Sequence, residues 1–230
     1  MKVKLFGYTQ PVEDIREELG IEDVQDLIAY CAKVSNPQLQ GDLSKADRLV
    51  NYLITHKHWS PFEMASATLE IETTRDIARQ MLRHRSFAFQ EFSQRYANPQ
   101  DMDEYFVLRE ARLQDEKNRQ NSINLDFDME THVILNGAWK NKQVEVIEAA
   151  KKAYDWAIAN GIAKEQARAV LPEGNTVSRL YMQGTIRSWI HYIELRAANG
   201  TQKEHMEIAR EVGKAISKIF PLATQFISEN

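Results

Sequence analysis

The chain has 230 residues, 43% of them hydrophobic, and a formal net charge of −4. This length, without a Pro/Gly/Ser-rich linker or a repeat, predicts one domain over residues 1–230. The acidic balance argues against a general nucleic-acid binder, and no apolar run approaches the ~20 residues of a membrane span. A single cysteine, Cys31, excludes an intrachain disulfide and gives no reason to expect secretion, so we expect a cytoplasmic protein.

Hydrophobic periodicity predicts an α+β fold. Alternation of apolar and polar residues is typical of strands, and we expect strands near 1–8, 64–72, 103–108 and 175–183. Apolar residues at helical spacing predict helices near 22–34, 44–56, 143–159 and 203–219. The stretch near 109–142 is polar and weakly periodic, and we expect a long excursion there with little regular structure.

A further helix is expected directly after the second strand, because Thr73 or Thr74 can cap it and apolar residues follow at helical spacing. Its end carries Arg83-His84-Arg85, three consecutive residues that can be positively charged. Neighbours on a helix lie ~100° apart, so the triplet suits a helix end, where several cations can converge on one anionic ligand. The alternative interpretation is that cations simply favour the negative end of the helix dipole.

Aromatic residues follow this triplet, at Phe87, Phe89 and Phe92. Cations beside aromatic rings suit a planar, anionic ligand such as a nucleotide or a flavin. Stacking on single-stranded nucleic acid is the alternative, although the acidic net charge of the chain argues against it.

A second informative helix is expected over 184–196, where four apolar residues form a buried stripe. Arg187, His191 and Glu194 line a different face, and Arg196 comes at the end. Taken alone, this pattern favours a solvated face with an Arg–Glu pair.

Four segments closely resemble signature elements of the flavin-dependent thymidylate synthases. In chain order they are His58-Trp59-Ser60-Pro61-Phe62-Glu63, then Arg83-His84-Arg85 followed by Glu91, Ser93 and Arg95, then Ala167-Arg168-Ala169-Val170-Leu171-Pro172, and finally Ile186-Arg187-Ser188-Trp189 to Glu194-Leu195-Arg196. One Arg-His-Arg would be a weak signal. Four elements in the family's order, spanning most of the chain, are a strong one.

The resemblance implies an enzyme of the methyltransferase class that makes dTMP from dUMP. It implies FAD as cofactor, 5,10-methylenetetrahydrofolate as carbon donor and NADPH as reductant. It also implies an antiparallel or mixed sheet wrapped by helices, in a homotetramer whose active sites lie where subunits meet. No nucleic acid or membrane is expected as a partner.

The resemblance also implies roles for individual residues. Arg196 matches the family's uracil-activating arginine and is the expected catalytic residue. Contacts to FAD are implied for Ser60, Arg83, His84, Arg85, Glu91, Thr185, Arg187 and His191. Contacts to dUMP are implied for Gln80, Arg83, Glu91, Phe92, Ser93, Gln94, Arg95, Arg168 and Arg196.

Five positions depart from the family pattern. Ala88 stands where members commonly carry a serine, and Gln90 stands where they often carry an asparagine. Thr185 and His191 stand where some relatives have asparagines, and Met64 replaces a histidine seen in some members. If that serine hydroxyl contacts the flavin or folate in family members, Ala88 lacks one ordinary hydrogen bond, worth ~1 kcal/mol.

Other catalytic chemistries receive little support from the sequence. The pair His56 and His58 does not predict a metal site, because histidines two apart diverge on a helix and no His-Glu-x-x-His element exists. No Gly-x-Gly-x-x-Gly fingerprint supports a Rossmann site. Ser93 has no general base fixed beside it by sequence, so we expect it to position substrate. Cys31 lies outside every matched motif, which fits a synthase that does not use a cysteine nucleophile.

Overall fold

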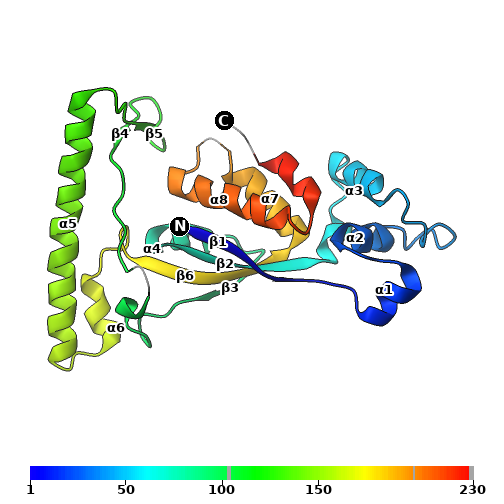
Figure 1. Ribbon diagram of the computed structural model, residues 1–230, viewed down its shortest axis with the longest axis horizontal. Helices are drawn as coiled ribbons and strands as arrows, with labels where there is room; N and C mark the ends of the chain where they lie inside the picture. Colours follow the sequence, from blue (N-terminus) through cyan, green and yellow to red (C-terminus); the bar gives the residue numbers. More distant parts are fainter. Residues whose placement is uncertain (103–104, 199, 228–230) are drawn as a thin grey trace.

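Four strands form one sheet at the centre of the computed structural model, which describes residues 1–102, 105–198 and 200–227 (Figure 1). The strands are β1 (Lys2–Tyr8), β2 (Ser66–Thr74), β3 (Ala88–Glu91) and β6 (Val177–Thr185), in the spatial order β1-β2-β6-β3. Each neighbouring pair is antiparallel. The sheet is therefore antiparallel, not mixed.

The alternation predicted for β2 is confirmed by its burial. Ala67, Leu69 and Ile71 are at most 1% exposed, whereas Thr68, Glu70 and Glu72 are only half-buried. Successive side chains of a strand point to opposite faces. One face of the sheet is consequently apolar and the other polar.

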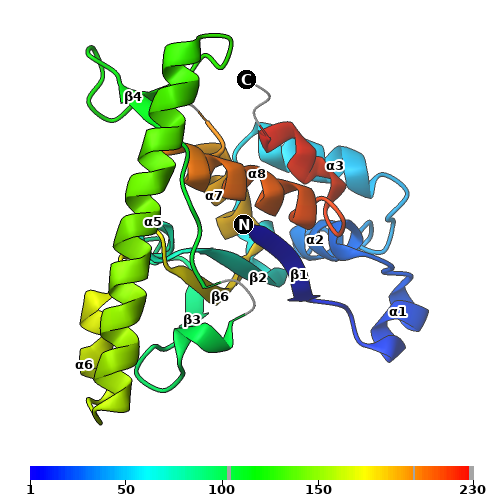
Figure 2. The same ribbon diagram turned by 60° about the vertical axis from the view of Figure 1, so that its left-hand side comes forward.

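Helices cover the apolar face. In both views α4 (Arg75–Met81), α7 (Ile186–Arg196) and α8 (Lys203–Ile216) lie above the sheet (Figures 1 and 2). At one end of the molecule follow α1 (Glu13–Leu19), α2 (Val24–Ala32) and α3 (Ala46–Thr55). The short 3-10 turns are Ser60–Glu63, Pro99–Asp101, Arg168–Val170 and Pro221–Phe226. Trp189 of α7 is fully buried on the sheet, where its indole N–H donates to the carbonyl of Ala67 at 3.1 Å.

The opposite face of the sheet carries rows of polar pairs. Arg179 donates to the carboxylate of Glu72, and Nζ of Lys2 lies 3.3 Å from the same carboxylate. In the next row the hydroxyl of Tyr181 donates to Glu70 at 2.6 Å. The ring of Phe6 packs edge-on against Tyr181 with centroids 5.0 Å apart, yet Phe6 stays 62% exposed. Within the described residues, this face of the sheet is left open to solvent.

The excursion predicted over 109–142 is wrong in its second half. A long helix, α5, spans Glu130–Ala159 and stands beside the sheet as a column (Figure 2). The helix begins at Glu130, whereas the sequence predicted a start near 143. The prediction missed the first turns because they bury no side chain within this chain. Val133, Ile134 and Leu135 are all exposed, and the buried positions of α5 start at Gln143. Without a buried stripe, the early turns leave no helical signal in the sequence.

The first half of the excursion contains a hairpin of β4 (Arg112–Gln114) and β5 (Ser122–Asn124). The strand predicted near 103–108 is reduced to an isolated bridge between Phe106 and Thr176, and residues 103–104 lie outside the described residues. After α5 the chain forms α6 (Lys164–Ala167) and then enters β6.

One contiguous core joins the sheet to α2, α3, α4, α7 and α8, and a smaller cluster around Tyr154 lies under α5. The architecture is a single α+β domain, which confirms the predicted class. Among the described helices, none is long and apolar enough to cross a membrane.

Candidate functional site

The Arg83-His84-Arg85 triplet follows α4, as predicted for a helix end. α4 ends at Met81, and the N–H of Leu82 donates to the carbonyl of Ala78 as the cap. Arg83 and Arg85 are exposed, and neither forms an ion pair with any described carboxylate. Unpaired cations at this position fit an anionic ligand as well as the negative end of the helix dipole.

Local packing explains how the chain turns from the triplet into β3. Phe87 packs edge-on against Trp189 of α7, with ring centroids 4.6 Å apart. Its ring also lies directly over Gly184 of β6, where a Cβ atom would clash with it. Glycine at this position therefore permits the close approach. The hydroxyl of Ser188 donates to the carbonyl of Ser86 at 3.3 Å, so the segment runs alongside α7.

His84 contacts the arginine at the end of α7. Nε of Arg196 donates to Nε2 of His84 at 3.0 Å. Because a guanidinium only donates, this ring nitrogen carries no proton. Burial, together with the positive charges of Arg196 and Arg83, lowers the pKa of His84, so the ring is neutral at pH 7. The Nη groups of Arg196 bond to none of the described residues, which leaves them available to a ligand.

The other end of α7 brings two of the matched motifs together. Thr185 caps the helix, because its hydroxyl accepts the N–H of Ser188 at 3.2 Å. Nη1 of Arg187 donates to Glu63 at 2.5 Å, whereas the pattern alone had favoured a pair with Glu194. The ring of His191 packs edge-on against Trp59 with centroids 4.8 Å apart. Ser60, in the same turn as Glu63, is exposed.

Burial and the neighbouring charge of Arg187 lower the pKa of His191, although Glu194 opposes the shift. His191 is accordingly neutral at pH 7 and can donate one hydrogen bond and accept another.

A second set of predicted residues lies at and beyond the end of β3. Oε1 of Glu91 accepts a hydrogen bond from Ser178 at 2.8 Å and lies 3.6 Å from Nη1 of Arg75. Arg75 is only 7% exposed, so Glu91 compensates a buried charge. The N–H of Phe92 donates to the carbonyl of Arg179 at 2.8 Å and continues the pairing with β6.

Two cations of this set meet at Glu165. Nε of Arg95 lies 3.4 Å from the Glu165 carboxylate, and Nε of Arg168 donates to the Glu165 carbonyl at 3.2 Å. The hydroxyl of Ser93 accepts the N–H of Arg95 at 3.4 Å. Gln94 is 3% exposed, and its Nε2 is buried without a hydrogen-bond partner among the described residues. Its amide therefore faces the interior of this chain.

Within one chain, the predicted residues thus form two separate groups. The first group lies on the side of α7 and α8, and comprises Ser60, Gln80, Arg83, His84, Arg85, Thr185, Arg187, His191 and Arg196. The second group comprises Glu91, Phe92, Ser93, Gln94, Arg95 and Arg168. No hydrogen bond or ion pair of the described residues joins the two groups. In both views α6 and the turn after β3 lie below the sheet, whereas α7 and α8 lie above it (Figures 1 and 2).

The structure also reveals polar residues that sequence reasoning missed. His205 of α8 is fully buried and contacts Gln80, with Nδ1 of the histidine 3.2 Å from Oε1 of the amide. Nε2 of His205 lies 3.0 Å from the hydroxyl of Tyr192, and Nε2 of Gln80 donates to Oε1 of Gln202 at 2.8 Å. A lone histidine in the apolar pattern of a helix gives no signal that could have identified this contact.

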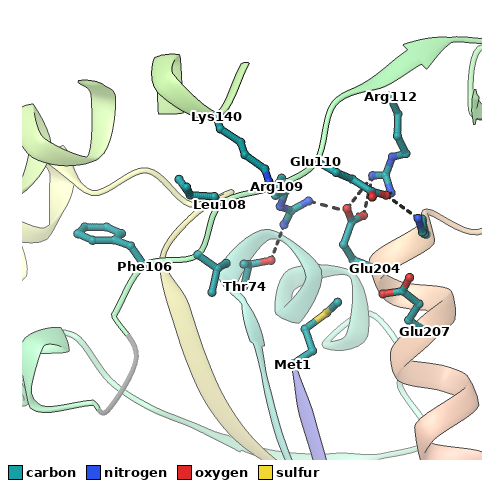
Figure 3. A pocket seen from close by; sticks show the side chains of 12 residues that line it. Met1, Thr74, Phe106, Leu108, Arg109, Glu110, Arg112, Lys140, Glu204 and Glu207 are labelled. Atoms are coloured by element: carbon teal, nitrogen blue, oxygen red, sulfur yellow. Dashed lines mark hydrogen bonds and ion pairs between the residues drawn. The ribbon is translucent and has the colours of Figure 1, made fainter. Parts of the chain in front are cut away.

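Beyond Gln202 lies a cavity of about 650 Å³ (Figure 3). Its polar wall is centred on Glu204, which accepts two hydrogen bonds from Arg112 at 2.7 and 2.9 Å. Arg109 lies 3.8 Å from Glu204 and donates to Asp76 at 2.5 Å and to Thr74. None of the residues predicted from the sequence lines this cavity. Its charges are mostly paired with one another, which fits a structural polar cluster.

Glu204 should stabilise the fold in a pH-dependent manner. Burial alone would raise its pKa, but the hydrogen bonds from Arg112 and the charges of Arg112 and Arg109 hold it below the usual 4.5. A carboxylate with a depressed folded-state pKa stabilises fully above its unfolded pKa, and this stabilisation is lost as the pH falls through the folded value. We expect Glu204→Gln to lower the free energy of unfolding by about 2 kcal/mol at pH 7.

Chemical denaturation at pH 7 and at pH 3 measures this effect. The difference between wild type and Glu204→Gln should shrink at pH 3. Glu207 lines the same cavity without an ion pair to any described residue, so Glu207→Gln is the matched control, with an expected change within about 0.5 kcal/mol. An equal loss of stability in both variants, or a difference independent of pH, would contradict this role.

The side chains of the first group fit the cofactor implied by the resemblance. A diphosphate requires cationic and hydrogen-bond donors, which the exposed Arg83 and Arg85 supply. A flat ring system requires an apolar surface with a few polar groups. Phe87 and the neutral ring of His84 are half-buried and lie in the same segment as these arginines, with their ring centroids 6.4 Å apart.

Comparison with protein families gives a match over most of the chain. The family model described as thymidylate synthase complementing protein matches residues 20–222. A flavin-dependent thymidylate synthase of Synechocystis sp. is 51% identical over 222 residues, and a probable flavin-dependent thymidylate synthase of Paramecium bursaria Chlorella virus 1 is 46% identical over 222 residues. Each alignment covers 96% of this chain and 96% of the relative.

Among solved structures, the fold is similar to that of the UMP/dUMP methylase PolB from Streptomyces cacaoi, bound with 5-Br UMP. The TM-score is 0.75 at 24% sequence identity, and the match covers 98% of this chain and 92% of that chain. At this identity the likeness shows the shared fold.

Proposed function

The chain belongs to the family of flavin-dependent thymidylate synthases, and we propose that it makes dTMP by reductive methylation of dUMP, with 5,10-methylenetetrahydrofolate as carbon donor and NADPH as reductant. Membership makes it an enzyme of the methyltransferase class with flavin, as FAD, for its cofactor. The reductant, the carbon donor and a cytoplasmic location are parts of the proposal.

The observation that carries the proposal furthest is the arrangement of Arg196. Carbon C5 of uracil is a poor nucleophile until negative charge can develop on the ring. A guanidinium remains protonated and presents fixed donors, so it can stabilise that charge near N3 and O4. His84 accepts a hydrogen bond from Nε of Arg196 at 3.0 Å. The Nη groups of Arg196 therefore remain available to the uracil ring. We assign the catalytic role to Arg196 and an orienting role to its contact with His84.

The cofactor-binding residues follow from the first group and one member of the second. Flavin, when bound, supplies the reducing hydride. We assign His84 and Arg85 to positions beside the isoalloxazine ring of the flavin, where a cation and a neutral hydrogen-bond donor can stabilise negative charge on that ring. Arg83 and Arg187 offer charged donors, and the remaining contacts are assigned to Ser60, Glu91, Thr185 and His191. Arg187 is already paired with Glu63, so its contact with the cofactor requires sharing or exchange of that partner.

The substrate-binding residues combine both groups. A phosphate requires charge-assisted donors, which Arg95 and Arg168 provide in the second group, helped by the hydroxyl of Ser93. Gln80 and Arg83 come from the first group, as does Arg196 for the ring. Glu91, Phe92 and Gln94 complete the assigned contacts. Because Gln94 is 3% exposed in one chain, its contact is the one that requires the largest local change.

A homotetramer explains the separation of these two groups. If the first group of one subunit faces the second group of another, each complete site lies at an interface. Exposed apolar residues on α5 supply a surface for such contacts, since Ile134 is 63% exposed and Trp156 is 62% exposed. Large exposed apolar side chains along one helix are typical of an interaction surface.

Retention of flavin tests the proposal. The purified protein is incubated with FAD, separated from free ligand by gel filtration, and examined by visible absorption. We expect a retained flavin band that bleaches anaerobically with NADPH. A folded protein that retains no flavin would contradict the proposed function, and nucleotide and single-stranded nucleic-acid binding would then be measured.

Cys31 should be dispensable for the chemistry. It lies on α2, outside both groups of predicted residues, and burial raises the pKa of its thiol, which disfavours the nucleophilic thiolate. We expect Cys31→Ala to keep dTMP formation within about twofold of wild type and to lower stability by about 1 kcal/mol. Turnover and thermal unfolding are measured on the same FAD-loaded preparations. Loss of dTMP formation in a folded, flavin-retaining variant would contradict a cysteine-independent reaction.

A further inference from the structure

A chain of hydrogen bonds connects Tyr192 of α7 to Glu204 of α8 through the side chain of Gln80. Its members are Tyr192, His205, Gln80, Gln202 and Glu204, with successive separations of 3.0, 3.2, 2.8 and 3.1 Å. Four of these residues, Tyr192, His205, Gln202 and Glu204, have no role in the proposed reaction. The chain also reaches Gln80, which the proposed function assigns to dUMP.

The donor and the acceptor of every hydrogen bond in this chain of contacts follow from Glu204, the ionised residue at one end. Glu204 is ionised and held by Arg112, so it can only accept, and Nε2 of Gln202 must donate to it. Oε1 of Gln202 then accepts from Nε2 of Gln80. This leaves Oε1 of Gln80 as an acceptor facing His205, whose Nδ1 must therefore carry the proton and donate.

The same logic fixes the state of His205. With its proton on Nδ1, Nε2 accepts the hydroxyl hydrogen of Tyr192. Burial, the charge of Arg196 and the neighbouring His84 ring lower the pKa of His205 to about 3. The ring is therefore neutral over the physiological range, and one tautomer satisfies both of its contacts.

An amide has two hydrogens on nitrogen and two lone pairs on oxygen. The chain of hydrogen bonds uses one N–H and one oxygen lone pair of Gln80. One N–H and one lone pair of this amide therefore remain for a ligand. Their directions depend on which way the amide is turned, and only His205 and Gln202 determine this among the described residues.

We propose that His205 is a positioning residue, which holds the amide of Gln80 in the orientation that presents its free N–H and carbonyl lone pair to the nucleotide. This inference rests on the proposed function, because it requires dUMP to bind beside Gln80. His205 itself acts through Gln80 and does not touch the substrate.

Two substitutions separate the contacts of His205. An Asn side-chain nitrogen can occupy the position of Nδ1, so His205→Asn keeps the donor to Gln80 and loses the acceptor for Tyr192. A Gln side chain reaches the position of Nε2, so His205→Gln keeps the contact with Tyr192 and loses the donor to Gln80. Both variants keep a polar amide in the buried site, which makes them matched in folding cost.

The test is the Kd for dUMP, measured by calorimetry on FAD-loaded protein. We expect His205→Gln to weaken dUMP binding about tenfold, the equivalent of one lost hydrogen bond, and His205→Asn to restore most of that affinity. In a Gln80→Ala background, His205→Gln should produce no further change, because residues that act through one another are not additive.

The outcomes distinguish this inference from the function on which it rests. A wild-type protein that does not bind dUMP would overturn both. If wild type binds dUMP and forms dTMP, equal Kd values for wild type and His205→Gln overturn the inference alone. So does a tenfold loss that persists in the Gln80→Ala background, because His205 would then act by general destabilisation.

Discussion

Replacing Arg196 with Lys is expected to cut dTMP formation about 100-fold or more, although the positive charge remains. Removal of one preorganised donor to a developing anion costs about 10²–10³ in turnover. Lysine has a single rotatable ammonium instead of a planar fork, so it cannot keep the contact with His84 and still present two fixed donors to the ring. Single-turnover formation of dTMP on FAD-loaded protein measures the effect without interference from product release.

The loss should appear mainly in the chemical step. We expect the Kd for dUMP to change by less than about tenfold, because the proposed phosphate contacts of Arg95 and Arg168 are unaltered. Arg48 is exposed on α3, outside both groups, so Arg48→Lys is the matched control and should behave as wild type. Near-normal dTMP production by folded Arg196→Lys would refute the catalytic role assigned to Arg196.

Mixing two inactive variants is expected to restore activity if each site is shared between subunits. Arg196→Ala damages the first group and Arg168→Ala damages the second. Each variant assembled alone should fall to roughly one per cent of wild-type turnover at low dUMP. After random mixing of equal amounts, roughly a quarter of the sites should combine an intact first group with an intact second group.

Differently tagged variants, coexpressed and purified through both tags, measure this complementation. As the matched control, wild type is mixed with a chain that carries both substitutions. Sites shared between subunits predict roughly a quarter of wild-type activity in this mixture too, whereas sites within one chain predict roughly half. No recovery on mixing the single variants would show that both groups belong to one chain, and would contradict the interface model.

Much of the fold could be predicted because its elements carry strong local patterns. β2 alternates strictly, since one of its faces is buried and the other is not, and the structure places it at Ser66–Thr74. α7 has both a capping threonine and a continuous apolar stripe that packs on the sheet. The end of α4 just before Arg83 could be predicted because three adjacent cations do not share one helical face.

Other elements carried no such pattern. β3 is only four residues long, Ala88–Glu91, so the aromatic residues in and beside it indicated a ligand surface and did not reveal a strand. The early turns of α5 remain exposed in one chain, so no buried face imposed a period on their sequence. In both cases the missing information is the packing partner, which a local reading of the sequence does not contain.

The candidate site, like the fold, could be predicted from the sequence only in part. The resemblance supplied the residues of both groups, but no spacing rule could predict that Arg196 donates to His84 across 112 positions of sequence. No spacing rule could show that Arg187 pairs with Glu63, or that His205 lies against Gln80. These contacts exist only because α4, α7, α8 and the Ser60–Glu63 turn pack on one face of the sheet.

Formation of dTMP by the purified protein is the most direct test of the proposed activity. FAD-loaded protein is reduced anaerobically with NADPH, mixed with dUMP and 5,10-methylenetetrahydrofolate, and the nucleotides are separated by chromatography and identified by mass. We predict dTMP that depends on every component and is also formed by Cys31→Ala. A folded, flavin-loaded protein that consumes NADPH but leaves dUMP unmethylated would rule out the proposed activity.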